Sequence, residues 1–187
     1  MSSFRKIVLI GGSAGSLNVL LELLPELHSD LSLPIVIVLH RKYATDSALE
    51  ILFASKTNLP VREVAEKEPI SAGVIYTAPA DYHVLFEQDG TFSLDFSEKV
   101  NFSRPSIDVA FESAAEVYGP SLVCILLSGA SADGVKGMKI AKEQGAILAV
   151  QDPTTAEVPF MPEQALLHIN IDSVIPAGAL GEYINSL

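Results

Sequence analysis

The sequence contains the three residue types that together make a serine hydroxyl reactive. A hydroxyl is a weak nucleophile at neutral pH, so it needs a base within hydrogen-bond reach and a partner that orients that base. Ser13, His40 and Asp133 each follow closely after an apolar segment of the chain. They can act as nucleophile, general base and orienting carboxylate if the fold brings the ends of those three segments together.

The residues around Ser13 form a turn between a predicted strand and a predicted helix. The segment 4–10 is largely apolar. The leucines that follow are spaced as on one face of a helix: Leu17, Leu20, Leu21, Leu24 and Leu27. Three interpretations compete, namely an ordinary turn with Ser13 or Ser16 as helix cap, a dinucleotide-binding turn, and a nucleophile elbow. The spacing Gly11-x-Ser13-x-Gly15 matches the elbow, whereas the dinucleotide motif G-x-G-x-x-G is absent.

Strand and helix patterns alternate through most of the chain, which predicts an α/β fold. The segments 34–39 and 122–127 are apolar throughout, as is typical of strands covered on both faces. We expect one domain with a doubly wound, mostly parallel sheet in a Rossmann-like three-layer arrangement. Ligands bind such sheets beyond the carboxyl ends of the strands, and there Ser13, His40 and Asp133 would share one rim.

The middle of the chain departs from this alternation. Segments 82–87 and 91–96 flank Gln88-Asp89-Gly90, which is a hairpin signal. Short strands are also predicted at 61–64 and 74–77. We therefore expect a small antiparallel hairpin insertion in this section.

Composition limits the possible partners. The net charge of −11 argues against nucleic acid or an anionic membrane as the main partner. No apolar run is long enough to span a membrane and the first residues do not form a secretory signal, so we expect a cytoplasmic protein without direct membrane insertion. Cys124 is the only cysteine, which excludes a cysteine-based metal site, and the four histidines show no ligand spacing.

The elbow interpretation assigns a role to each group. His40 takes the proton from Ser13 and passes it to the leaving group, while Asp133 fixes the imidazole tautomer. The backbone amides at Ala14 and near Ala130 are candidates for holding the oxyanion. The chain order Ser…His…Asp differs from the Ser…Asp/Glu…His order of α/β-hydrolases.

Several motifs, in order along nearly the whole chain, resemble the catalytic domain of chemotaxis receptor protein-glutamate methylesterases. They are Ile10-Gly11-Gly12-Ser13-Ala14-Gly15, Val38-Leu39-His40, Ile75-Tyr76-Thr77-Ala78-Pro79, Arg104-Pro105-Ser106-Ile107-Asp108, Leu127-Ser128-Gly129-x-x-x-Asp133-Gly134 and Gln151-Asp152…Met161-Pro162. The resemblance implies hydrolysis of glutamyl γ-methyl esters on the cytoplasmic helices of chemoreceptors, with release of methanol, and deamidation of certain glutamines. It also implies that no cofactor is used.

The chain differs from the family pattern at several positions. Ala14 and Ser16 stand where the family usually has Thr and Gly, Ala130 where it has Met, and Phe160 where it has Gly. The family's N-terminal receiver domain is absent from this sequence, so we expect a stand-alone catalytic domain. These differences leave two alternatives open: a methylesterase-like binding module with little activity, and a nucleotide-binding α/β module, against which the missing G-K-[ST] motif argues.

Other candidate residues have plainer explanations beside the functional ones. Arg104 is a candidate substrate contact, or it forms only a salt bridge or a cap. His83 is expected to be structural, and Asp133 has the alternative of capping its own helix. Arg41 and Lys42 would place positive charge near His40.

Overall fold

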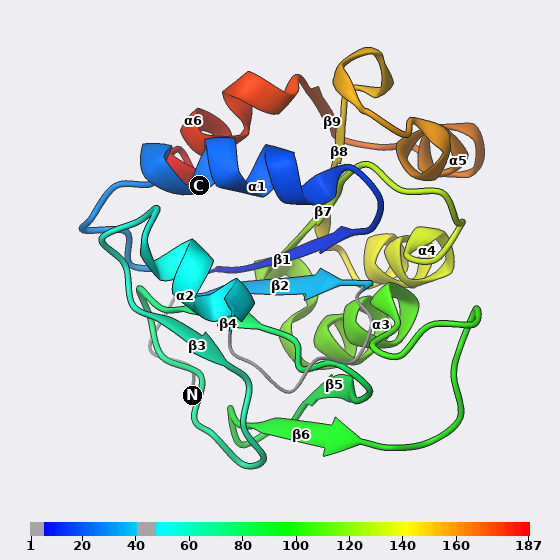
Figure 1. The fold of residues 1–187 in the computed structure, drawn as a ribbon. Coiled ribbons are helices and arrows are strands. Elements are labelled where there is room, and N and C mark those ends of the chain that lie inside the picture. The colour runs from blue at the N-terminus through cyan, green and yellow to red at the C-terminus, as the bar shows by residue number, and fades with distance from the viewer. Residues whose placement is uncertain (1–5, 41–47) are drawn as a thin grey trace.

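A seven-stranded parallel sheet forms the centre of the molecule. The structure is a computed structural model that describes residues 6–40 and 48–187. The strand order is β3-β4-β2-β1-β7-β8-β9 (Figure 1). The strands are β1 (Ile7–Gly12), β2 (Ile35–Leu39), β3 (Val61–Glu63), β4 (Ile75–Thr77), β7 (Leu122–Leu126), β8 (Ile147–Gln151) and β9 (Ser173–Ile175). All of their pairings are parallel, as predicted.

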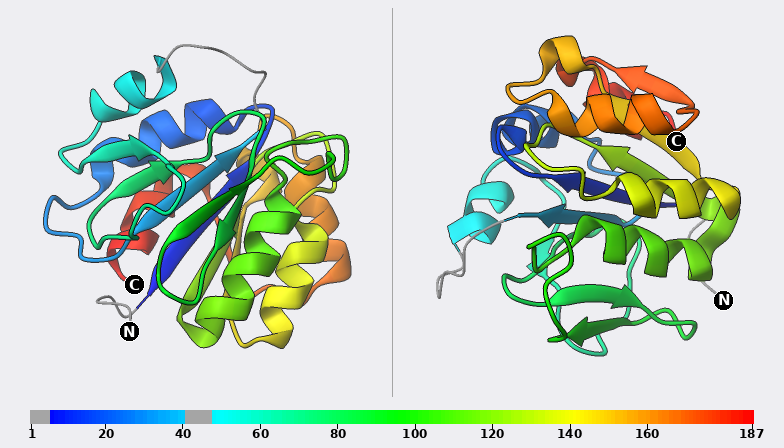
Figure 2. Two further views of the ribbon diagram at one scale, coloured as in Figure 1. Left: turned by 90° about the horizontal axis from the view of Figure 1, so that it is seen from below. Right: turned by 90° about the vertical axis from the view of Figure 1, so that its right-hand side faces the viewer.

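Helices cover both faces of this sheet (Figure 2). They are α1 (Ser16–Leu23), α2 (Ala48–Ala54), α3 (Ile107–Tyr118), α4 (Val135–Glu143), α5 (Phe160–His168) and α6 (Leu180–Asn185). Side chains of α1, α2 and α6 pack in one apolar core, and those of α3, α4 and α5 pack in the other. The result is the doubly wound three-layer arrangement that the alternating pattern predicts.

The continuous apolar strands follow from this layering. Every residue of β1 is buried, and its side chains alternate between the two cores. Ile7 and Leu9 lie in the core beneath α3, whereas Val8 and Ile10 lie in the core beneath α1. A strand that is covered on both faces needs apolar residues at successive positions, which is why no alternation is visible in its sequence.

The predicted hairpin is present, but it accounts for only part of the middle section. Strands β5 (His83–Phe86) and β6 (Phe92–Asp95) form a separate antiparallel pair. The short strands at 61–64 and 74–77 are not part of this insertion, because β3 and β4 extend the main parallel sheet at its edge. Phe92 packs edge-on against Tyr76, which fixes the hairpin to the sheet.

Two prolines lie near helix boundaries. Pro25 lies in the 3-10 turn that follows the end of α1 at Leu23. Pro162 is the third residue of α5, which starts at Phe160. A proline is tolerated there because amides of the first turn have no partner within the helix. The predicted strand start at Phe4, and the segment 41–47 with Arg41 and Lys42, lie outside the described residues.

Among the described residues, no helix is both long enough and apolar enough to cross a membrane.

Candidate active site

Ser13 and His40 follow neighbouring strands at matching positions. In the register of β1 and β2, Gly12 pairs with Leu39, and the His40 amide extends the ladder by donating to the Gly12 carbonyl at 3.1 Å. On the other side of β1, the Ser13 amide donates to the Ser128 carbonyl at 3.0 Å. Ser13 therefore lies one residue beyond the sheet, between His40 and the loop that follows β7.

Two other serines hold the Ser13 turn in place. Ser16 Oγ accepts a hydrogen bond from Ser13 N at 2.8 Å and donates one to Ser128 O at 2.7 Å. Ser128 Oγ donates to Ala14 O at 2.7 Å and accepts from Val158 N at 2.9 Å. The hydroxyls of Ser16 and Ser128 are both engaged in these hydrogen bonds. Ser13 is therefore the serine of the turn whose hydroxyl is available to react.

The turn needs glycine where it approaches other loops. Gly15 precedes α1 at φ 81°, and no side chain caps the helix, so the interpretation with Ser13 or Ser16 as cap is wrong. A Cβ at Gly129 would lie 2.5 Å from Met161 Cε and 3.0 Å from Ser13 Cβ. The lack of a side chain at Gly129 therefore lets the loop after β7 pack close to the nucleophile.

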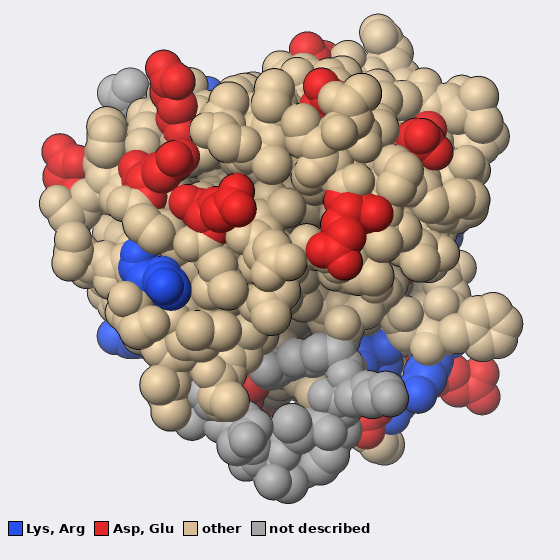
Figure 3. Space-filling model, turned by 45° about the horizontal axis from the view of Figure 1, so that its top comes forward, with Lys and Arg blue, Asp and Glu red and all other residues tan. Residues whose placement is uncertain are grey.

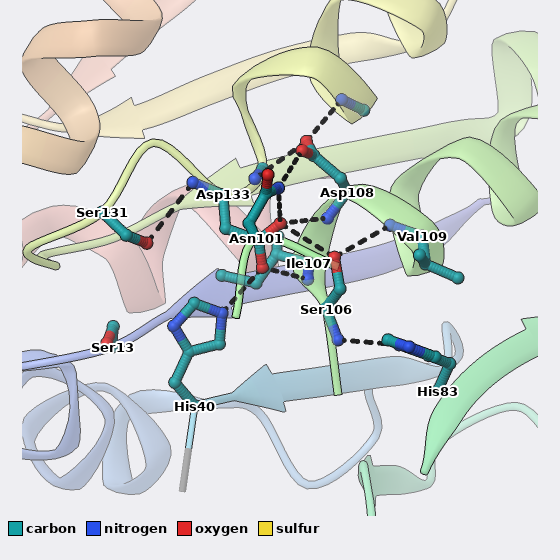
Figure 4. Close-up of polar contacts among 12 residues, drawn as sticks. Ser13, His40, His83, Asn101, Ser106, Ile107, Asp108, Val109, Ser131 and Asp133 are labelled. Carbon is teal, nitrogen blue, oxygen red and sulfur yellow. Dashed lines mark hydrogen bonds and ion pairs between the residues drawn. The ribbon is translucent and has the colours of Figure 1, made fainter. Parts of the chain in front are cut away.

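His40 and Asp133 are in direct contact, as predicted. His40 Nε2 lies 2.7 Å from Asp133 Oδ2, and the carboxylate is fully buried while the imidazole is partly exposed. In Figure 4 the second ring nitrogen of His40, Nδ1, is turned toward Ser13. The imidazole is thus oriented by the carboxylate through one nitrogen and presents the other to the serine turn.

The hydrogen bond predicted between Ser13 and His40 is not formed in this structure, in which both residues are described. Neighbouring strands hold their backbones about 4.8 Å apart. Side-chain rotation, rather than movement of the strands, therefore decides whether the contact forms. Catalytic hydrogen bonds are often long without substrate and shorten only in the complex.

Five donors converge on the buried Asp133 carboxylate. They are His40 Nε2 (2.7 Å), Ile107 N (2.6 Å), Ser106 Oγ (2.8 Å), Asn101 Nδ2 (2.9 Å) and Asp108 N (3.2 Å). Two of them are first-turn amides of α3, which have no partner within the helix and favour a negative charge. Burial raises the pKa of Asp133, but these hydrogen bonds, led by those from His40 and Asn101, outweigh it and lower the pKa to about 2.

Asp108 completes a reciprocal arrangement of α3 and α4. Its Oδ1 accepts from Gly134 N at 2.9 Å and from Gly137 N at 2.7 Å, at the start of α4. Asp133 accepts from the start of α3, so the alternative in which it caps its own helix is wrong. Burial raises the pKa of Asp108, and the negative charge of Asp133 raises it further against the opposing hydrogen bond from Gly137.

His83 supports the start of α3 and has a structural role, as expected. Ser106 is the N-cap of α3 and accepts a hydrogen bond from Val109 N at 3.4 Å. The Ser106 amide donates to His83 Nδ1 at 3.1 Å, and His83 Nε2 lies 3.0 Å from the Glu98 carbonyl. Both nitrogens of this buried imidazole are therefore occupied within the chain.

The two candidate oxyanion donors lie in the loops beside Ser13. Ala14 follows Ser13 directly, and Ala130 follows Gly129, whose backbone packs against Ser13. Both residues are exposed, and within the described residues neither amide donates a hydrogen bond. An oxyanion hole requires backbone donors that are free in this way.

Arg104 is engaged within the chain. Its guanidinium donates to Asp81 Oδ1 at 2.7 and 3.1 Å and to the carbonyls of Phe96 and Ser97, and it lies 3.9 Å from the centre of the Phe96 ring. The salt-bridge explanation therefore describes Arg104 in this structure, and the contact with substrate stays a prediction.

The sequence patterns do not indicate the roles of two residues that shape the site. Asn101 lies in a turn outside the regular elements, and its contacts with Asp133 depend on the tertiary fold. Gln151 Oε1 accepts from Ser128 N at 2.9 Å and so fixes the loop after β7. Gln151 belongs to the motif Gln151-Asp152…Met161-Pro162, but the motif does not reveal its contact with the loop after β7.

The charged side chains on the face that Figure 3 shows are mainly acidic. On the face that Figure 3 shows, Asp and Glu are spread across the upper part and Lys and Arg are few, in keeping with the net charge of −11. Residues 6–40 and 48–187 contain no group of three His, Cys, Asp or Glu side chains that could hold a metal ion.

Fold and site together define a doubly wound α/β domain that carries a serine turn and a buried His–Asp pair at the carboxyl rim of its sheet. The family model described as CheB methylesterase matches residues 8–184. The chain therefore belongs to the CheB methylesterase family, as its motifs predict.

Named relatives and a solved structure agree with this assignment. A Leptospira interrogans protein, provisionally named protein-glutamate methylesterase/protein-glutamine glutaminase, is 43% identical over 94% of this chain and 91% of its own length. The protein-glutamate methylesterase/protein-glutamine glutaminase of Thermotoga maritima is 34% identical over 97% of this chain and 54% of its own length. The crystal structure of the Thermotoga maritima CheB methylesterase catalytic domain is 32% identical, with a TM-score of 0.94 over 98% of both chains.

Proposed function

We propose that this protein hydrolyses γ-methyl esters of glutamyl residues in chemoreceptor-type proteins, releasing methanol and leaving a glutamate carboxylate. Family membership and the names of the relatives support the substrate class. The observation that carries the mechanism is the 2.7 Å contact of Asp133 with His40, which lies one residue beyond β2 and beside Ser13.

In the first half of the reaction the glutamyl acyl group is transferred to Ser13. His40 Nδ1 takes the proton of Ser13 as Oγ attacks the ester carbonyl carbon, and the oxyanion that forms accepts hydrogen bonds from the amides of Ala14 and Ala130. The intermediate then collapses: the bond to the methoxy oxygen breaks, and the imidazolium gives its proton to the leaving methanol. Asp133 stays ionised throughout, as its low pKa requires, and stabilises the imidazolium.

In the second half water replaces methanol. His40 takes a proton from the water as the oxygen attacks the acyl carbon, and Ser13 leaves with that proton. The acid that forms releases its remaining proton to solvent, which leaves the glutamate carboxylate and the free enzyme, so one ester bond and one water molecule are consumed. The same sequence with ammonia as leaving group deamidates a glutamine, and the glutaminase part of the relatives' names supports this second reaction.

The proposed reaction determines the compartment in which the protein acts and the partner that it binds. The substrate is the cytoplasmic helical part of a methylated receptor, so the reaction takes place in the cytoplasm, and neither a nucleic acid nor a cofactor takes part. Residues 1–187 act as a single catalytic domain.

A methylesterase-like binding module is the second candidate. Two observations favour it: Ala14 and Ala130 replace larger family residues beside Ser13, and no hydrogen bond joins the described side chains of Ser13 and His40 in this structure. Such a module would bind a receptor without releasing methanol.

A fluorophosphonate probe distinguishes the two candidates. The probe reacts with activated serines, and the adduct is mapped by mass spectrometry while methanol release from a methylated receptor fragment is measured in parallel. The esterase gives an adduct on Ser13 and releases methanol. Receptor binding with neither an adduct nor methanol would favour the binding module and refute the esterase.

A further inference from the structure

A two-residue turn lies immediately outside the His–Asp pair. Val100 N donates to Ser103 O at 3.2 Å and Ser103 N donates to Val100 O at 2.9 Å, which closes a turn over Asn101 and Phe102. Both central residues have positive φ, 52° and 63°, as in a type I′ turn. Figures 1 and 2 show this loop beside the rim where β1 and β2 end.

The backbone conformation of this turn is unusual for one of its residues. Asparagine adopts positive φ readily, but a bulky residue such as Phe102 rarely does. The Phe102 side chain is 98% exposed, so no packing contact explains why it is held in this conformation. Strained backbone of this kind persists where the surroundings require it, and here the contacts of Asn101 are the evident requirement.

The side-chain amide of Asn101 joins two buried carboxylates. Asn101 Nδ2 lies 2.7 Å from Asp108 Oδ2 and 2.9 Å from Asp133 Oδ1 (Figure 4). Because both partners are carboxylate oxygens, the NH2 group and not the carbonyl must face them, and each of its two hydrogens serves one carboxylate. Within the described residues, no other side chain donates to both.

We propose that Asn101 is a positioning residue for the esterase: its amide holds Asp133 and Asp108 together and so sets the orientation in which Asp133 meets His40. This inference rests on the proposed function. It extends the site by one residue, from the buried carboxylate to a turn at the molecular surface.

Two like charges make this bridge necessary. Asp108 and Asp133 are both buried, and both accept a hydrogen bond from Asn101 Nδ2. Without that donor, nothing between the two carboxylates offsets their electrostatic repulsion where they face Asn101. The remaining donors to Asp133 outside His40 all come from the start of α3, namely Ser106 Oγ, Ile107 N and Asp108 N. Asn101 is thus the donor that ties the carboxylate to a second, separate part of the chain.

Removal of the amide should change the chemistry more than substrate binding. Asp133, Asp108 and His40 are the titratable groups that contact one another here among the described residues. Hydrogen bonds from Asn101 lower the pKa values of the Asp108 and Asp133 carboxyls. Without these bonds, both carboxyls hold protons more tightly. The acid limb of the pH–rate profile should therefore move to higher pH.

Asn101→Gly, with Phe102→Gly as control, provides the test. Glycine adopts positive φ without cost, so both variants keep the turn, but only the first loses the bridge. We expect Asn101→Gly to lower kcat for methanol release, and the rate of fluorophosphonate labelling of Ser13, on the order of tenfold, as loss of a hydrogen bond to a charged group would. KM should change little, and Phe102→Gly should label at the wild-type rate.

The outcomes separate this proposal from the proposed function. Wild-type kcat, labelling rate and pH profile in a folded Asn101→Gly protein would overturn the positioning role and leave the esterase intact. Equal losses in both glycine variants would overturn it as well, because the turn and not the amide would then matter. A wild-type protein that neither labels at Ser13 nor releases methanol would refute the esterase itself.

Discussion

Replacing Asp133 with asparagine should remove activity by changing the tautomer of His40. The variant keeps the size of the side chain but replaces one carboxylate oxygen with an NH2 group. If that group takes the place of Oδ2, Ile107 N loses its acceptor and His40 must present an unprotonated Nε2. The imidazole proton then sits on Nδ1, the nitrogen turned toward Ser13, where it cannot accept the serine proton (Figure 4).

The expected losses can be estimated from these contacts. A wrong tautomer in a serine triad lowers kcat by roughly four orders of magnitude. The Asp133 carboxylate is fully buried and its pKa is lowered from 3.8 to about 2, which corresponds to about 2 kcal/mol of stability. For a chain of this size, that amounts to a melting temperature lower by roughly 4–8 °C.

The pH dependence of stability has a definite sign. Because the pKa of Asp133 is lower in the folded protein, its stabilisation is complete above its ordinary value of 3.8 and is lost as the pH falls through about 2. The difference in melting temperature between wild type and Asp133→Asn should therefore narrow over that range. The raised pKa of Asp108 acts in the opposite direction, and because the charge of Asp133 contributes to that rise, Asp133→Asn reduces this opposing effect as well.

Methanol release and thermal unfolding across pH are the two assays for this variant. Asp89→Asn is the matched control, because Asp89 is an exposed residue whose carboxylate hydrogen-bonds only within the hairpin turn. An Asp133→Asn protein with wild-type stability, or with activity within about tenfold of wild type, would contradict the role of the buried carboxylate.

Two further predictions concern the loops beside the nucleophile. Gly129→Ala places a Cβ 3.0 Å from Ser13 Cβ and 2.5 Å from a methionine side chain, so labelling of Ser13 by a fluorophosphonate should slow at least tenfold, whereas Gly178→Ala, which meets no atom within 4 Å, should leave the labelling rate unchanged. Equal labelling rates would show that this close approach is unimportant. Ala14→Thr and Ala130→Met restore the residues usual in the family at the two candidate oxyanion positions and should raise kcat without altering the fold; no gain from both changes together would show that these positions do not limit turnover.

The sheet and the edge that carries the site were predictable because burial on both faces restricts which residues a strand can contain. Strands covered on both faces must be apolar throughout, so β1, β2 and β7 are visible as uninterrupted runs. Once they are placed side by side and parallel, Ser13 and His40 must lie at the same edge. The contact of Asp133 with His40 follows from the same rule.

The contacts that hold the catalytic side chains in position were not predictable in the same way. Asp108 belongs to the motif Arg104-Pro105-Ser106-Ile107-Asp108, but the motif does not reveal that the Asp108 side chain binds the start of α4. Asn101 and Gln151 act through partners distant in the sequence, and no local pattern marks such pairs. The exchange of caps between α3 and α4 depends on how closely the two helices pack, which is a tertiary property.

A double-mutant comparison of Ser13→Ala and His40→Ala tests most directly whether Ser13 is a nucleophile activated by His40. Methanol release from a methylated receptor fragment is measured for wild type, both single variants and the double variant, with melting temperatures as a check on folding. Ser13→Ala leaves the backbone amides of the turn in place, so the loss of stability should be within about 1–2 kcal/mol. Each single change should lower activity by several orders of magnitude, and the double variant should be hardly worse than either, because the groups act as one unit. Additive losses, or a Ser13→Ala protein that keeps most of its activity, would contradict nucleophilic catalysis by Ser13.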